Sequence, residues 1–280
     1  MLTIALSTGS LHSYGLARVF EMAAQAGFEA IEVLVDHRWD SRQPVYLRRL
    51  SQEHNLPIIA IHSPFVILHT PGWPRDALGR LRESVGLARE LGARVVVAHL
   101  PLRIRAIRLE FFGFQRQGLL LPLPLGGERV YRDFLLNGLA GYERREEVLI
   151  GVENMPSRRF LGHPFDIHDL NTPEAMSRLP HLTLDTTHIG TWGWDLLAVY
   201  EQLKERIVHV HLSDFDGQEH RLLGSGQLPL AGLLRRLKRD HYEGAISVEL
   251  GPQALQAEDA DLAQAHLRQA LAFCREHLAD

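Results

Sequence analysis

Short apolar segments rich in valine and isoleucine alternate with longer segments of helical periodicity along the chain. The short segments predict strands near 2–7, 30–35, 57–62, 94–99, 148–153, 181–185, 207–212 and 245–250. The longer segments predict amphipathic helices near 15–26, 44–54, 74–91, 128–145, 192–205, 229–240 and 258–277. Pro74 and Pro173 suit the first turns of helices, and Gly27 and Gly92 follow helix ends.

Several of the expected strands, such as 94–98, are almost continuously apolar instead of alternating. This pattern is typical of a parallel sheet covered on both faces. Eight strand-then-helix units favour an α/β fold closed into a (β/α)₈ TIM barrel. The 280 residues suit one such barrel, which needs about 250 residues, so we expect a single domain over 1–280. An open doubly wound sheet is the alternative, but no Gly-x-Gly-x-x-Gly turn follows an early strand.

The segment 101–127 departs from this alternation. It follows the fourth expected strand, so in a barrel it lies on the face where catalytic residues gather. Long loops there are usually lids or binding loops. Its leucine and phenylalanine content equally fits a contact between subunits of a homo-oligomer.

Composition narrows the class of protein. A net charge of −4 gives no general attraction to nucleic acid or to an anionic membrane. The single cysteine, Cys274, excludes a disulfide within the chain and a cysteine-based zinc site, and it fits a cytoplasmic protein. The first residues have the pattern of a strand and not of a signal peptide, and no apolar run approaches the roughly 18 residues of a membrane span.

Acidic residues and histidines close most of the expected strands. The second strand ends near Glu32, and the following six bring His62, His99, Glu153, Asp185, the pair His209 and His211, and Glu249. In a barrel these strand ends meet at one mouth. One such residue would usually be structural, but several buried carboxylates together need a compensating cation. Carboxylate and imidazole ligands favour one divalent ion, namely Mn²⁺, Zn²⁺, Co²⁺, Fe²⁺ or Mg²⁺, over Ca²⁺.

The spacing of these residues separates their expected roles. Four of them come from four successive strands and could surround one ion: Glu153, Asp185, His211 and Glu249. Because His209 and His211 are two apart on one strand, both face the same way, and we expect His211 to ligate while His209 packs beneath it. His188 is expected in a turn, where it contacts substrate or a metal ligand. Asp214, before Gly224-Ser225-Gly226, suits a turn role and a site role equally.

These motifs resemble those of the xylose isomerase-like barrels, which include sugar isomerases and epimerases and the apurinic-site endonucleases related to endonuclease IV. The resemblance covers nearly the whole chain through His62-Ser63-Pro64, Val152-Glu153-Asn154, Asp185-Thr186-Thr187-His188, 209–214, Gly224-Ser225-Gly226 and Glu249. For the epimerase branch it implies one metal on Glu153, Asp185, His211 and Glu249. It also implies that Glu153 and Glu249 act as the acid–base pair and that His188 contacts a substrate oxygen.

For the endonuclease branch the resemblance implies three zinc ions, with His62, His99 and His220 as additional ligands. Two positions depart from that pattern, because Gln218 and Ser225 replace an aspartate and a glutamate. The arginines Arg103, Arg105, Arg108, Arg158 and Arg159 suit the phosphate of a sugar phosphate or of a nucleic acid backbone. Lys204 and Lys238, the two lysines, fall in expected helices, which disfavours a hydride shift assisted by lysine.

The leading hypothesis is therefore a metal-dependent isomerase or epimerase for a sugar or sugar phosphate, acting by proton transfer through an enediolate. In it, His62, His99, His220 and Arg158 bind substrate. The alternatives are a zinc-dependent endonuclease at abasic DNA, an inosose or keto-acid dehydratase, and a barrel that binds a ligand without turnover.

Overall fold

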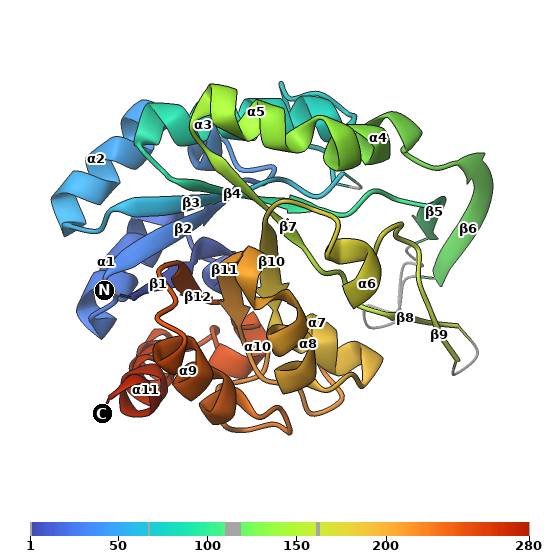
Figure 1. Cartoon of the computed structure of the whole chain (residues 1–280). Coiled ribbons are helices and arrows are strands. Elements are labelled where there is room, and N and C mark those ends of the chain that lie inside the picture. Colours follow the sequence, from blue (N-terminus) through green and yellow to red (C-terminus); the bar gives the residue numbers. More distant parts are fainter. Residues whose placement is uncertain (1, 67, 110–118, 161–162, 280) are drawn as a thin grey trace.

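Eight parallel strands close into a barrel, as the sequence predicts (Figure 1). The computed structural model describes residues 2–66, 68–109, 119–160 and 163–279. The strand order around the barrel is β1-β12-β11-β10-β7-β4-β3-β2, and every pairing is parallel. The barrel strands are β1 (Thr3–Ser7), β2 (Ala30–Leu34), β3 (Ile58–His62), β4 (Val95–His99), β7 (Leu149–Glu153), β10 (Leu182–Asp185), β11 (Ile207–Leu212) and β12 (Ala245–Val248).

Helices connect these strands and cover the outside of the barrel (Figure 1). The long ones are α1 (Leu16–Ala26), α2 (Pro44–His54), α3 (Ala77–Leu91), α9 (Leu230–Arg239) and α11 (Ala260–Leu278). Gly27 and Gly92 end α1 and α3 with φ of 93° and 73°, a left-handed conformation that glycine adopts without strain. Pro173 opens the short helix α6 (Pro173–Met176), as expected. Pro74 precedes its helix because Asp76 caps α3, accepting a hydrogen bond from Gly79 N at 2.8 Å.

Two expected helices are wrong in outline. The helix expected over 128–145 is divided into α4 (Arg129–Asn137) and α5 (Leu139–Glu146) at Gly138, where a Cβ atom would lie 2.9 Å from the Phe134 ring. The helix expected over 192–205 is the shorter α8 (Leu196–Leu203) followed by a 3₁₀ turn over Lys204–Arg206, and a separate helix that was not expected, α7 (Thr186–Trp192), precedes it. Asp185 starts α7 directly after β10 by accepting a hydrogen bond from His188 N, so His188 lies in a helical first turn and not in an open turn.

Short additions extend the ends of two barrel strands. The described part of 101–127 contains the antiparallel strands β5 (Ile104–Leu109) and β6 (Leu119–Gly126), and 110–118 lie outside the described residues. A second ribbon, β8 (Arg158–Phe160) and β9 (His163–Phe165), follows β7. The segments next to these two ribbons are hydrogen-bonded to each other: Arg103 N, before β5, donates to Ile167 O, after β9, at 2.8 Å. Whether 101–127 is a lid or an interface stays a prediction.

The remaining short elements are the 3₁₀ turns η1 (Thr8–Leu11), η2 (Asp40–Arg42) and η3 (Lys204–Arg206), and the helix α10 (Pro252–Leu255). Within the described residues, no helix combines the length and apolar character that crossing a membrane requires.

Candidate metal and active site

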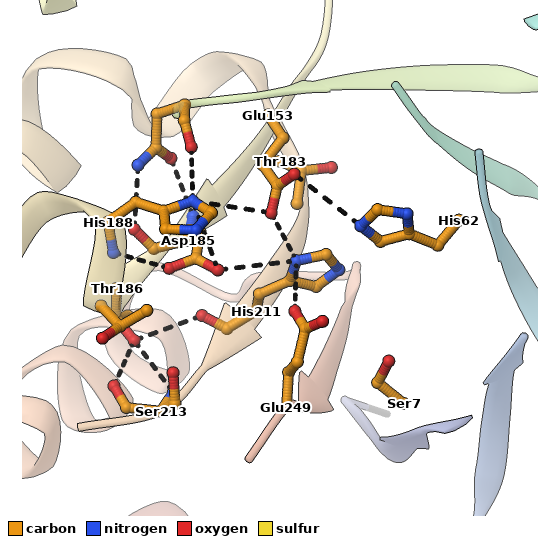
Figure 2. A network of polar contacts seen from close by, with 12 residues as sticks. Ser7, His62, Glu153, Thr183, Asp185, Thr186, His188, His211, Ser213 and Glu249 are labelled. Atoms are coloured by element: carbon orange, nitrogen blue, oxygen red, sulfur yellow. Dashed lines mark hydrogen bonds and ion pairs between the residues drawn. The ribbon is translucent and has the colours of Figure 1, made fainter. Parts of the chain in front are cut away.

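The barrel register brings the predicted site residues together at the carboxyl ends of the strands. His99 is the Cα partner of Glu153, and Asp185 is the partner of His211. Glu249 directly follows β12, where its N–H donates to Leu212 O of β11 at 3.2 Å. Figure 2 shows Glu153, Asp185 and Glu249 gathered around the His211 ring.

The Nδ1 atom of His211 is the centre of this group. It lies 2.8 Å from Glu153 Oε1, 3.0 Å from Glu249 Oε2 and 3.8 Å from Asp185 Oδ2. One ligand atom from each of these four residues lies within 4.8 Å of the others. The two carboxylate oxygens of Asp185 have different contacts. Oδ1 caps α7, whereas the buried Oδ2 has no hydrogen-bond partner. This is the donor set that the sequence predicted for one divalent ion.

The electrostatics of the group show an excess of buried negative charge. Burial raises the pKa of Asp185 well above its usual range, and the neighbouring Glu153 carboxylate adds to the effect. Burial alone would lower the pKa of His211, but the carboxylates of Glu32, Glu249 and Glu153 outweigh it and raise that pKa well above normal. Within the described residues, the ion-pair partners of Glu32, Glu153, Asp185 and Glu249 are all histidines.

Glu32 is part of this site, although sequence reasoning assigned it no role. Its Oε2 accepts hydrogen bonds from His209 Nε2 at 2.6 Å and from His211 Nε2 at 3.0 Å, and all three side chains are fully buried. His209 therefore packs beneath His211, as predicted, and both rings share one carboxylate. The signal in the sequence was a charged residue in the middle of an apolar strand, Ala30–Leu34, where an unpaired charge is costly.

His62 and His99 lie on the other side of Glu153. Their Nε2 atoms are 3.8 Å and 3.7 Å from Glu153 Oε2, and the three residues form a second group with ligand atoms within 4.8 Å. The ring of His62 stacks on that of His211, with centroids 5.4 Å apart. Burial, with the nearby His62, lowers the pKa of His99 to about 3, so its ring is neutral and able to accept a hydrogen bond or bind a cation.

The other predicted substrate-binding residues are more dispersed. The Nδ1 of His188 lies 2.8 Å from the backbone oxygen of Asn154 and 3.6 Å from Asp185 Oδ2. His220 packs edge-on against His188, with ring centroids 5.8 Å apart. Arg158 is exposed on β8 and lines a cavity beside His99 instead of the His211 group.

Asp214 organises the loop that carries His220. Its buried carboxylate accepts hydrogen bonds from four backbone N–H groups at 2.8–3.1 Å, those of Phe215, Gly224, Gly226 and Leu228. A Cβ atom at Gly226 would lie 2.4 Å from Asp214 Oδ1. Glycine at this position therefore allows the backbone N–H groups of the Gly-Ser-Gly motif to approach the Asp214 carboxylate closely. Of the two roles left open for Asp214, these contacts support the turn role.

Asp214→Ala is therefore expected to lower the free energy of unfolding by about 3 kcal/mol, because it leaves buried backbone donors unpaired. Urea unfolding followed by circular dichroism measures this. Asp216→Ala is the control, because Asp216 forms a partly exposed ion pair with Arg221, and such pairs contribute at most about 1 kcal/mol. Equal effects of the two substitutions would contradict the assignment.

Residues 20–276 match the family model of the xylose isomerase-like TIM barrel. Among curated proteins, the chain is 26% identical over 297 residues to an uncharacterized protein of Mycobacterium tuberculosis, covering 98% of this chain and 97% of that protein. It is 21% identical over 264 residues to the fructoselysine 3-epimerase of Shigella flexneri, covering 84% and 85%.

Solved structures of the same fold include two kinds of enzyme. The 3-keto-D-glucoside 4-epimerase YcjR from Escherichia coli superposes with a TM-score of 0.69 at 18% identity, over 99% of this chain and all of that one. The AP endonuclease, family 2, from Brucella melitensis superposes with a TM-score of 0.62 at 18% identity, over 90% and 94%. At these identities the two structures establish the shared fold.

Proposed function

Because the chain belongs to the xylose isomerase-like TIM barrel family, we propose that it is a divalent-metal-dependent isomerase or epimerase. Its substrate would be a sugar or sugar derivative, sugar phosphates included. One observation carries the proposal: two carboxylates, Glu153 and Glu249, contact the same nitrogen of His211 at 2.8 Å and 3.0 Å. The names of similar proteins that act on sugars, a fructoselysine 3-epimerase and a 3-keto-D-glucoside 4-epimerase, agree with it.

The donor set fits a divalent ion. Glu153, Asp185, His211 and Glu249 would hold it, and the buried Oδ2 of Asp185, which has no hydrogen bond, is the clearest sign that a cation belongs there. Three carboxylates and one imidazole suit Mn²⁺, Co²⁺, Fe²⁺, Zn²⁺ or Mg²⁺. When bound, such an ion would polarise the carbonyl of a sugar and make the adjacent C–H more acidic.

The chain's own residues would move the proton. Glu153 comes from β7 and Glu249 follows β12, so their carboxylates approach from opposite sides of His211 (Figure 2). One carboxylate would accept the proton from the substrate carbon, and the other would deliver a proton to the opposite face. The configuration at that carbon is then inverted with no net gain or loss of protons. His188 donates Nδ1–H to the Asn154 carbonyl, which leaves Nε2 for a substrate hydroxyl.

The test is solvent exchange. Protein loaded with Mn²⁺ is incubated in D₂O with the D-ketohexoses and their phosphates, and proton NMR follows loss of the C–H signal next to the carbonyl. Exchange that accompanies epimer formation is the expected result. Absence of exchange with every sugar and every metal ion tried would contradict the proposal.

A second candidate, a zinc phosphodiesterase acting on abasic DNA, is favoured by one observation: His62, His99 and Glu153 form a second ligand group. Elemental mass spectrometry separates the two, because about one ion per chain supports the epimerase and about three zinc ions support the endonuclease. A dehydratase sharing the enolate chemistry would give one ion and a dehydrated product.

Glu32 is assigned a positioning role in this proposal. By accepting Nε2–H of His211 it would fix the tautomer that leaves Nδ1 free to bind the ion. Glu32→Gln is expected to weaken metal affinity by about 10–100-fold, measured by titrating the metal-free protein with Co²⁺ and recording its visible absorption. Glu53→Gln, on the exposed surface of α2, is the control. Unchanged Co²⁺ affinity in Glu32→Gln would refute the role.

A further inference from the structure

A cavity of about 80 Å³ lies beside the candidate metal site. His99 belongs to its wall, and the same ring has Nε2 at 3.7 Å from Glu153 Oε2. Phe65, also in the wall, stacks on His99 with ring centroids 4.3 Å apart. Met155, two residues after Glu153, completes this side. His99 therefore belongs both to the wall of the cavity and to the ligand group around Glu153, which places the cavity next to the proposed acid–base pair.

The lining of the cavity is mainly apolar, with contributions from Phe65, Val66, Leu81, Leu100, Met155 and Ile167. The buried guanidinium of Arg80 is engaged by the backbone oxygens of Phe65, Leu68 and Pro74. Tyr131 donates its hydroxyl to His99 O at 3.0 Å. These two polar side chains are therefore occupied by the protein itself.

Two buried ring nitrogens in this wall make no hydrogen bond: Nε2 of His99, which lies 3.7 Å from Glu153 Oε2, and Nδ1 of His168. The His168 side chain is only 6% exposed, and its Nδ1 makes no hydrogen bond although Asp166 Oδ1 lies 3.5 Å away. Buried polar atoms without a partner are rare, and each needs an explanation. A ligand atom that hydrogen-bonds His168 inside this mainly apolar cavity would provide one.

From these observations we propose that the cavity binds an apolar substituent of the substrate, so that the enzyme acts on a ketose conjugate in preference to a free sugar or a sugar phosphate. The inference rests on the proposed function. A water-sized group needs about 10–15 Å³, so the cavity holds about five to eight such groups, the size of a phenyl ring or a branched alkyl chain. The linking nitrogen or oxygen would hydrogen-bond His168.

The alternatives fit less well. The hydroxyl groups of an unsubstituted sugar chain would lose their hydrogen bonds to water against these walls, which is unfavourable. A phosphate would be attracted to Arg158, but that residue is exposed, so the phosphate would stay in solvent and leave the apolar volume unfilled.

The first experiment compares substrates. The four D-ketohexoses are offered to the Mn²⁺-loaded protein in D₂O as free sugars, as 1-phosphates and as 1-deoxy-1-benzylamino derivatives. We expect kcat/KM for at least one benzylamino derivative to exceed that of its free and phosphorylated forms by about 10-fold or more. Preference for a free or phosphorylated ketose would overturn this inference alone. Exchange in no compound would overturn the proposed function as well.

The second experiment fills the cavity. Val66→Trp should raise KM for the benzylamino derivative by about 10-fold or more and change kcat/KM for the free ketose by less than about twofold. Val45→Trp is the matched control, because Val45 is 76% exposed on α2 and does not line the cavity. Thermal unfolding checks that both variants fold. An equal loss for both substrates in Val66→Trp would overturn the assignment.

Discussion

Glu249→Gln is expected to leave the barrel folded while lowering kcat by about 10³-fold or more. Glutamine has the same shape, but its amide accepts no proton at neutral pH, so the variant removes half of the proposed acid–base pair. The side chain is 15% exposed and contacts His211 Nδ1 at 3.0 Å, so substrate can reach it while it contacts the metal group. The measurement is the rate of C–H exchange in D₂O under saturating sugar and excess Mn²⁺.

The control and the metal content make this result interpretable. Glu258→Gln changes an exposed glutamate and should retain full activity. Elemental analysis of Glu249→Gln distinguishes a lost base from a lost ligand, because the acid–base role requires loss of turnover with the ion still bound. Near-normal exchange by metal-loaded Glu249→Gln would refute the assignment of Glu249.

Chelation of the bound ion is expected to abolish activity and to lower Tm by about 5–10 °C. Without a cation, Glu153, Asp185 and Glu249 crowd around one imidazole, and their mutual repulsion is buried. An ion present at a thousand times its Kd stabilises the folded state by about 4 kcal/mol, which corresponds to this shift for a domain of this size. Calorimetry before and after removal, and again after adding Mn²⁺, measures it.

Asp185→Asn tests the specificity of that response. The amide oxygen can still cap α7 through His188 N, so the helix is preserved while a negative charge is lost from the ligand group. We expect this variant to show at least tenfold weaker binding of Mn²⁺ and a smaller Tm shift. Full activity of the chelated wild-type protein, with an unchanged Tm, would show that no ion is needed.

Local pattern was sufficient for the barrel strands and for most of the site. Each barrel strand is a short apolar run ending in turn residues, and its period and length are properties of the segment alone. Because parallel strands of a closed barrel end at one mouth, placing Glu153, Asp185, His211 and Glu249 at strand ends was enough to predict that they meet. The resemblance of these motifs to a known family pointed the same way.

Local pattern failed where a short contact decides an element's boundary. The helical stretch is divided at Gly138, a residue of low helix propensity, where the Phe134 ring lies close to the place of a side chain. Asp185 ends a strand and starts a helix at once, through a cap to His188 N that periodicity does not show.

The sequence by itself therefore determined the barrel and the convergence of its acidic and histidine residues, because strand period and strand ends are local. Only the tertiary structure showed that Glu32 pairs with His209 and His211, because these partners lie 177 and 179 residues away in the chain. It also decided the role of Asp214 and revealed the cavity beside His99, whose wall joins residues between Ser63 and His168. Such features depend on which distant side chains share a volume, and pattern within one segment carries no information about that.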